Sequence, residues 1–174
     1  ATVEQIDAVA SADIHIRKGG ILDVSVTERK PEILWRSAYG LEMLDRTGHR
    51  VATLLDRAAR PELPVVAGEG ADAHVDEALQ LFAAAGPLGP RVRGLIRIGE
   101  RRWDVVLDRD QRVLLPEDDP VSALQRVAAL DAAQDLMARN LTMMDMRNPA
   151  RPTVRIAAPS TELLTSQISG VSAP

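Results

Sequence analysis

Alternating apolar and polar positions in the segment 101–127 predict two strands followed by a helix. Residues 102–107 alternate with the period of a half-buried strand, and residues 112–115 are typical of the returning strand of a hairpin. Asp119 and Pro120 then open the helix, because aspartate is a good N-cap and proline fits the first helical position. This segment therefore predicts mixed α and β structure.

The rest of the chain shows the same two kinds of hydrophobic pattern, that of a half-buried strand and that of a helix with one apolar face. Residues 2–10 have the spacing of one face of a short helix, and residues 12–27 alternate on both sides of a turn at Lys18-Gly19-Gly20. We expect further strands at residues 32–36, 41–44, 51–52, 92–98, 141–147 and 153–156, and helices at residues 72–85 and 119–140. The sequence thus predicts an α+β fold, in which a short helix and a hairpin precede a mainly antiparallel sheet with two helices packed on one face.

Composition narrows the class of protein. Of the 174 residues 45% are hydrophobic, but aromatic residues are scarce, with two tryptophans, one tyrosine and one phenylalanine, so we expect an aliphatic core. The net charge of −4 gives no electrostatic reason to bind nucleic acid, and the lack of cysteine excludes disulfides and thiolate chemistry. No apolar run approaches the roughly 20 residues of a membrane span, and no signal peptide opens the chain. The first residues are typical of the middle of a domain, and we expect a further N-terminal part in the natural protein.

A glycine-rich turn is one candidate for cofactor chemistry. Residues 68–73 match G-x-G-x-x-G/A and precede a predicted helix, an arrangement that places backbone N–H groups around a pyrophosphate. Glu69 and Asp72, however, put negative charge where the phosphates would lie. We also expect no buried parallel strand before the turn, because Pro61 and Pro64 flank a run of only three apolar residues. The favoured interpretation is a plain turn and helix N-cap, without a cofactor.

Titratable and sulfur-containing residues give weaker signals. His15, His49 and His74 lie far apart in the sequence, and none has a second ligand at metal spacing, so no metal is expected. The carboxylates at residues 117–119 could serve catalysis or hold Mg²⁺, but helix capping and interaction with the helix dipole are the favoured interpretation. The methionines between residues 137 and 146 could form a binding surface, and core packing is the favoured interpretation.

The stronger lead to function is the short β-prone run at residues 153–156. Little sequence remains to pair with its outer side, so the run is a candidate edge strand whose free N–H and C=O groups could template a strand of a partner. The alternative is an edge protected by Arg151, Pro152 and Arg155. The residues alone leave both interpretations open.

Five segments, in order, resemble the FtsQ/DivIB family of bacterial cell-division proteins. They are ILDVSVTERKPEILW at residues 21–35, LDRTG at 44–48, LPVVAG at 63–68, the strand pair at 101–115, and MDMR at 144–147. Each segment is a weak signal alone, but five in this order make a fairly specific match.

The resemblance implies a domain order and a location. Residues 1–30 correspond to the C-terminal part of a POTRA module, residues 31–158 to the β domain of the family, and residues 159–174 to a flexible tail. Members of this family are single-pass proteins of the inner membrane that place these domains in the periplasm at the division septum. They act as non-enzymatic scaffolds of the divisome, the assembly that divides the cell.

The resemblance also implies a partner site. Family members bind FtsB and FtsL, chiefly by pairing a partner strand with the last strand of the β domain, and basic residues nearby would meet acidic side chains of the partner. Asn148 stands where some relatives have an aromatic residue. The expected partner-binding residues are Arg101, Arg102, Arg147, Asn148, Thr153, Val154, Arg155 and Ile156. Two alternatives remain: a periplasmic binding domain with another partner such as peptidoglycan, and a nucleotide- or metal-dependent enzyme.

Overall fold

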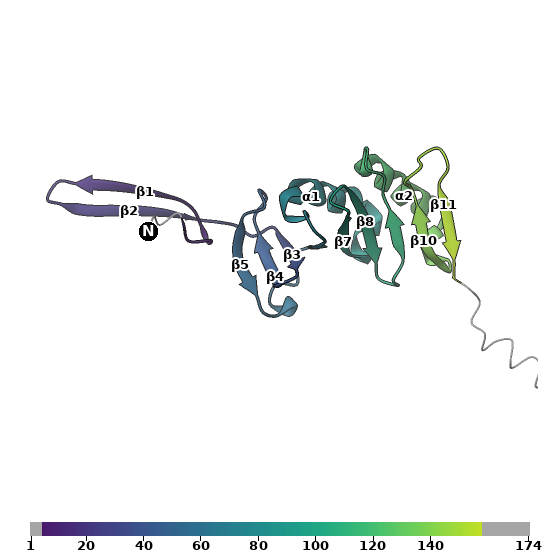
Figure 1. The fold of residues 1–174 in the computed structure, drawn as a ribbon, viewed down its shortest axis with the longest axis horizontal. Helices are drawn as coiled ribbons and strands as arrows, with labels where there is room; N and C mark the ends of the chain where they lie inside the picture. Colours follow the sequence, from purple (N-terminus) through teal and green to yellow (C-terminus); the bar gives the residue numbers. More distant parts are fainter. Residues whose placement is uncertain (1–4, 158–174) are drawn as a thin grey trace, which may run out of the picture.

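The protein consists of a long hairpin and a larger body in which two helices cover a sheet (Figure 1). This computed structural model describes residues 5–157. The hairpin is formed by β1 (Val9–Arg17) and β2 (Ile21–Glu28). Within the described residues the sheet has nine strands, in the spatial order β11-β10-β9-β8-β7-β6-β3-β4-β5. They are β3 (Ile33–Ser37), β4 (Gly40–Leu44), β5 (Arg50–Leu54), β6 (Val65–Ala67), β7 (Val92–Ile98), β8 (Arg102–Leu107), β9 (Arg112–Leu114), β10 (Leu141–Asp145) and β11 (Thr153–Ile156).

Most neighbouring strands of the sheet run antiparallel, as the sequence predicts. The meander β7-β8-β9 and the hairpins β3-β4-β5 and β10-β11 are antiparallel. Parallel pairs join β3 to β6, β6 to β7, and β9 to β10. The α+β class is therefore confirmed, and the parallel pairs are the part that the sequence did not indicate.

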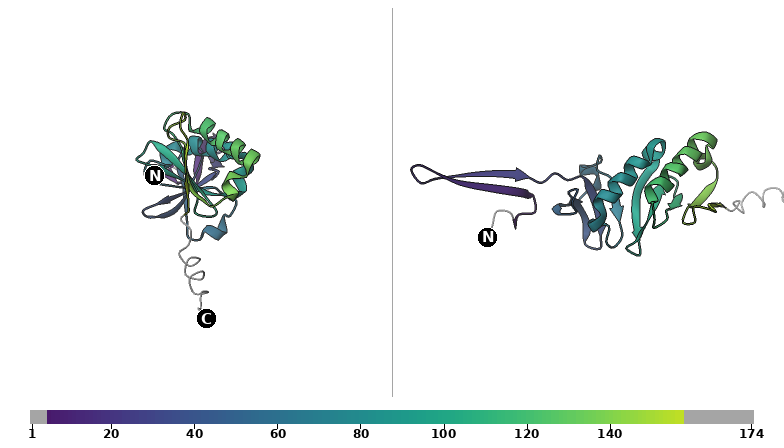
Figure 2. Two further views of the ribbon diagram at one scale, coloured as in Figure 1. Left: turned by 90° about the vertical axis from the view of Figure 1, so that its right-hand side faces the viewer. Right: turned by 90° about the horizontal axis from the view of Figure 1, so that it is seen from above.

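Both helices pack on the same face of the sheet (Figure 2). They are α1 (Val75–Ala84) and α2 (Pro120–Gln134), and the inward side chains of the strands, including fully buried Trp103, share one core with them. The Asp119 side chain accepts a hydrogen bond from the Ser122 N–H and caps α2, as predicted. This helix ends at Gln134, before the expected residue 140, because Asp135 adopts a left-handed conformation with φ 55°. We name the opposite side of the sheet the helix-free face.

The predicted helix at residues 2–10 is wrong over the described part of that range. Strand β1 begins at Val9, which pairs with Glu28, and residues 5–8 form a short irregular turn. The backbone N–H of Arg29 donates to the Ala8 carbonyl at 2.8 Å, so pairing with a distant strand overrides the local helical spacing. Residues 1–4 and the expected tail at 159–174 lie outside the described residues.

The hairpin extends away from the sheet (Figure 1) and exposes one apolar face. The pairs Ile14–Val24 and Ile16–Leu22 lie on this face, and each of the four side chains is at least 43% exposed. At the root of the hairpin, Arg29 Nη1 pairs with Asp45 Oδ2 at 2.5 Å and so ties the hairpin to the end of β4.

Candidate partner-binding edge

Strand β11 is one of the two outer strands of the sheet. It pairs with β10 on one side, in the register Asp145–Thr153, Met144–Val154 and Met143–Arg155, and among the described residues no strand pairs with its other side. All four of its residues are exposed. Within residues 5–157 the position predicted from the sequence is therefore an edge strand with an unpaired outer side.

The backbone direction of β11 decides which groups are free. The Ala157 N–H donates to the Asn140 carbonyl at 2.9 Å, and the Arg155 carbonyl accepts from Thr142 Oγ1 at 3.3 Å, so residues 155 and 157 turn their backbone groups toward β10. Because successive residues of a strand alternate in direction, Val154 and Ile156 turn their N–H and C=O groups outward. An added strand would bond to these two residues.

The side chains of β11 divide between the two faces of the sheet. Thr153 and Arg155 lie on the helix-free face, while Val154 shares the helix side with its buried partner Met144. Val154 is 51% exposed and Ile156 is 68% exposed. The edge therefore offers two apolar side chains next to two free backbone positions.

Arg147 lies directly after β10 and forms a bidentate ion pair with Asp145. Its Nη2 and Nε donate to the two carboxylate oxygens at 2.6 and 2.9 Å, and the backbone N–H of Arg147 donates to Asp145 Oδ1 at 3.0 Å. The hydrogen bonds from Arg147 lower the pKa of Asp145, and the carboxylate in turn raises the pKa of Arg147. Both residues line an open depression of about 450 Å³ together with Asn148, Arg151 and Thr153.

A second ion pair lies on strand β8, which is separated from β10 by β9. Arg102 Nη1 donates to Asp104 Oδ1 at 3.1 Å, and the Asp104 side chain is only 5% exposed. Burial raises the pKa of Asp104, and the positive charges of Arg102, Arg112 and Arg147 counteract this effect only in part. Since Arg102 and Arg147 both act on Asp104, the structure brings these two predicted residues into one charged cluster.

The remaining predicted residues are placed separately. Arg101 is exposed in the turn before β8 and makes no side-chain hydrogen bond or ion pair within residues 5–157. Asn148 is exposed in the loop between β10 and β11, where its Oδ1 accepts from the Ala150 N–H at 3.1 Å. The structure therefore separates the paired Arg102 from the unpaired Arg101, a distinction that the sequence left open.

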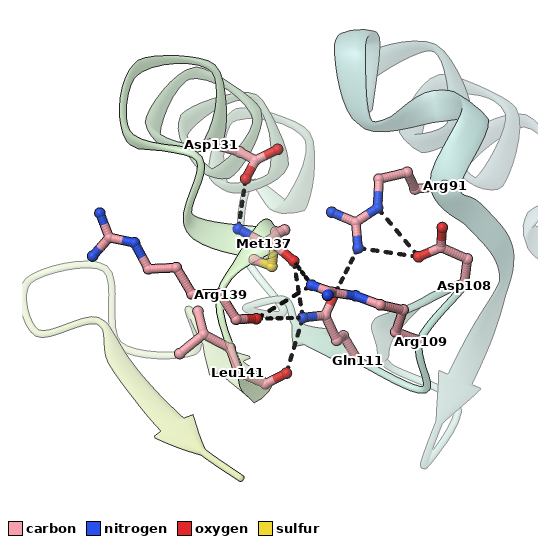
Figure 3. A network of polar contacts seen from close by, with 8 residues as sticks. All are labelled: Arg91, Asp108, Arg109, Gln111, Asp131, Met137, Arg139 and Leu141. Carbon is pink, nitrogen blue, oxygen red and sulfur yellow. Dashed lines mark hydrogen bonds and ion pairs between the residues drawn. The ribbon is translucent and has the colours of Figure 1, made fainter.

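A buried glutamine supports the strand that carries this edge (Figure 3). Gln111 is 3% exposed, and its Nε2 donates to the carbonyls of Met137 at 3.0 Å and Leu141 at 2.9 Å. Its Oε1 accepts from Arg91 Nη2 at 2.7 Å, and Arg109 adds a second donor to the Met137 carbonyl. These bonds attach the start of β10 to the turn between β8 and β9.

Sequence reasoning missed Asp104, Asp145 and Gln111. A signal was present for the two aspartates, since each alternates with apolar residues in a strand and stands two positions from an arginine. Gln111 gave no signal, because its carbonyl partners lie 26 to 30 residues away in the chain.

The glycine-rich turn at residues 68–73 needs a correction. The sequence predicted no buried parallel strand here, yet β6 pairs in parallel with β7, α1 connects them, and Val66 is fully buried. A Cβ on Gly68 would lie 2.2 Å from the Arg97 carbonyl oxygen, so this glycine permits close approach to β7. The His74 ring contacts the Gly70 carbonyl at 2.9 Å, and no side chain caps α1, so the expected N-cap is also wrong.

The other candidate sites give few structural signals. Among residues 5–157, no group of histidine and acidic side chains could hold a metal ion. In the same range, no helix has the length and apolar character needed to cross a membrane. Three of the methionines, Met137, Met144 and Met146, are buried in the core, which confirms their predicted packing role.

Comparison with known proteins gives consistent matches. Residues 33–147 match the family model described as Cell division protein FtsQ/DivIB, C-terminal. The chain is 52% identical over 152 residues to Cell division protein FtsQ of Roseobacter litoralis, covering 87% of the chain and 52% of that protein. It is 53% identical over 157 residues to the FtsQ of Cereibacter sphaeroides, covering 90% and 51%, and 53% identical over 154 residues to that of Paracoccus denitrificans, covering 88% and 45%. The chain thus spans about half the length of these relatives.

Proposed function

The chain belongs to the FtsQ/DivIB family of cell-division proteins, and from this premise we propose that it is a non-enzymatic assembly protein of the divisome that binds FtsB and FtsL. The observation that carries this proposal is the open outer side of β11, where Val154 and Ile156 turn their backbone groups away from the sheet. A partner strand added there would gain backbone hydrogen bonds along the whole edge, and the alternating side chains would set its register.

The arginines near β11 support the same edge as the partner-binding site. Arg151 and Arg155 have no side-chain hydrogen bond or ion pair within residues 5–157, and Arg101 is likewise unpaired. Arg147 is already paired with Asp145, so a partner carboxylate would join this pair and share its guanidinium. We propose that these arginines orient an acidic partner strand, which is a role in specificity and association rate more than in affinity.

The β1-β2 hairpin supports the part of the proposal that concerns the N-terminal module. Its exposed apolar face, formed by Ile14, Ile16, Leu22, Val24 and Val26, needs a cover in water. We propose that residues 1–30 are the last part of a POTRA module whose other elements supply this cover. We also propose that the full protein is anchored by one span in the inner membrane, with this region in the periplasm at the septum.

Calorimetric titration with the periplasmic segment of FtsB tests the edge. Val154→Pro removes an N–H that points away from β10, so the β10–β11 ladder keeps its bonds. We expect binding to fall by at least a hundredfold, whereas the matched control Val154→Ala, which keeps the N–H, should bind within a few-fold of the wild type. Circular dichroism must first show that both variants fold. Binding that survives the proline would place the interface elsewhere, and no binding by the folded wild type would contradict the proposal for this region.

A further inference from the structure

Unpaired arginines gather on and beside one side of the protein. Most arginines within residues 5–157 donate hydrogen bonds or form ion pairs through their guanidinium groups, and the exceptions are Arg36, Arg93, Arg101, Arg112, Arg126, Arg151 and Arg155. Of these, Arg126 lies on α2, whereas the others lie on the helix-free face or in the turns at its margin. The helix-free face also carries Asp104 and Asp145, which are paired with Arg102 and Arg147, so among the described residues arginines outnumber carboxylates on this side of a chain whose net charge is −4.

The strand register places four of these arginines on the helix-free face itself. Arg36 on β3 is level with Ala67 and Ile96 on the next two strands. Arg112 and Arg155 share a second row, which runs Gly94–Val106–Arg112–Met143–Arg155 across β7 to β11. Arg93 lies at the irregularity between Val92 and Gly94, at the start of β7. These four arginines, on β3, β7, β9 and β11, thus form a band across the helix-free face.

A hollow of about 250 Å³ lies within this band, between Arg36 and Arg93. Its floor is apolar and small, because Gly94 has no side chain and Ala67 a short one, while Val65, Ile96 and Val106 form its walls. The glycine is required by the strand spacing, since a Cβ at position 94 would lie 2.8 Å from the Val65 carbonyl oxygen. The sheet therefore combines an apolar depression with two arginines at its sides that form no ion pair within residues 5–157.

We propose that the helix-free face is a docking surface for an acidic peptide segment of a partner protein, which places an apolar side chain in this hollow and carboxylates on Arg36 and Arg93. Guanidinium groups bind carboxylates with two parallel hydrogen bonds, and within residues 5–157 neither of these two forms an ion pair or a side-chain hydrogen bond, although the charge of Arg93 contributes to lowering the pKa of Asp108. The charge on the surface and the shape of the floor both select such a ligand. The proposal stands on residues different from those of the β11 edge.

The geometry also allows one partner to occupy both places. Four strand spacings separate β7 from β11, which is roughly 19 Å, and about six extended residues span this distance. Arg112 and Arg155 lie along this path in a single register row. A segment that pairs with β11 could therefore continue across the helix-free face to the hollow.

Fluorescence anisotropy with a labelled peptide of alternating glutamate and leucine tests the surface. We expect the double variant Arg36→Glu/Arg93→Glu to weaken binding at least tenfold. Ala67→Leu, which fills the hollow without changing charge, should weaken it several-fold. The matched control is Arg126→Glu, which reverses an equally unpaired arginine on the opposite side and should change binding less than twofold. Thermal unfolding establishes that each variant is folded.

Further outcomes separate this proposal from the strand edge. A peptide of alternating glutamate and serine should bind more weakly than the leucine peptide, and Val154→Pro should leave binding of the leucine peptide unchanged. Lack of binding by the wild type, equal weakening by Arg126→Glu, or equal affinity for the serine peptide would overturn the docking surface. Loss of binding in Val154→Pro would assign the peptide to β11 and would also overturn it, without affecting the proposed function.

Discussion

The two edges of the sheet, β11 and β5, hold the same topological position but differ in how accessible their backbones are. In β5 the register shifts between its pairs with Met43 and Leu44, so that Val51 is an extra residue in the edge strand itself. On the other side of the sheet the shift falls between Leu141 and Met143, in β10, and β11 itself has no extra residue. A bulge in the outer strand interrupts the row of free groups that a new strand would need, so β5 is a poor template and β11 a good one.

The side chains at the two edges strengthen this contrast. Val51 on β5 is 8% exposed and packs inward, and Arg50 at the start of the strand is paired with Asp7 from the N-terminal segment. On β11, by contrast, Val154 and Ile156 are largely exposed, and Arg155 is unpaired within the described range. An edge that is bulged and covered is typical of protection against pairing, and an edge with regular backbone and exposed apolar side chains is typical of recognition.

Each edge is also supported by one buried polar residue, and the chemistry of the two differs. Gln111 is neutral and supports β10, whereas Asp45 is charged and supports the turn between β4 and β5. Asp45 Oδ1 accepts from the N–H groups of Thr47 at 2.8 Å and His49 at 3.0 Å, while its Oδ2 accepts from Arg29. Acid should therefore remove the support that Asp45 gives to the turn between β4 and β5, whereas the support that Gln111 gives to β10 does not titrate.

The largest effect on stability is expected for Gln111→Ala. The Leu141 carbonyl loses the Gln111 donor, Arg91 loses one of its two acceptors and keeps Asp108, and a small cavity remains, while Arg109 still donates to the Met137 carbonyl. We expect a loss of roughly 3 kcal/mol in the free energy of unfolding, measured by urea denaturation. Hydrogen exchange followed by mass spectrometry should show faster exchange in β10 and β11 than in β4 and β5. The exposed Gln134→Ala is the control, and uniform acceleration in all strands would contradict a local role.

Asp45→Asn should lower the free energy of unfolding somewhat less than Gln111→Ala does. The size of this loss should depend on pH. Burial alone would raise the pKa of Asp45, but the hydrogen bonds from Arg29, Thr47 and His49 outweigh it and lower the pKa from 3.8 to about 2. The depressed pKa stabilises the folded state above pH 4, and this contribution is lost as the pH falls through about 2. A shift from 3.8 to about 2 corresponds to about 2 kcal/mol. Urea denaturation between pH 7 and pH 2 should show the variant and the wild type converging in acid, and a constant difference would contradict this account.

A smaller change of opposite sign is expected for Asp104→Asn, in the ion pair with Arg102 on β8. Burial raises the pKa of Asp104, so the folded state binds a proton more readily than the unfolded state does. Stability therefore falls as the pH rises through the interval between the ordinary and the raised pKa, and it stays lower at neutral pH. The neutral asparagine should raise the free energy of unfolding at pH 7 and flatten its pH dependence. Destabilisation by this variant at pH 7 would show that the bond to Arg102 outweighs burial.

Local patterns predicted the elements that depend on local bonds. The meander β7-β8-β9 follows from alternation, the start of α2 follows from Asp119 and Pro120, and β11 was expected at the residues where it lies. The turn after β4 is likewise local, since Gly48 adopts the positive φ of 87° that this turn needs. In each case the residues that determine the element are close together in the sequence.

The parts that the sequence did not predict depend on distant contacts. Strand β6 has three residues and lies between β3 and β7, a pairing that no local period encodes. The start of β1 overrides a helical spacing because Val9 pairs with Glu28. For the candidate site, sequence indicated the edge and its arginines, but the separation of Arg101 from Arg102 required the side-chain geometry.

The smallest effect is expected at the protected edge, for Arg50→Ala. Its ion pair with Asp7 joins two side chains that are 49% and 44% exposed, and exposed pairs of this kind contribute little because water and salt screen them. We therefore expect unchanged stability in urea denaturation within about 0.5 kcal/mol, and less difference still at high salt. Partner binding should also be unchanged, because the bulge at Val51 continues to block strand addition when the ion pair is removed. If Arg50→Ala instead made β5 bind the partner segment, even in the presence of Val154→Pro, the ion pair and not the bulge would be what distinguishes the two edges.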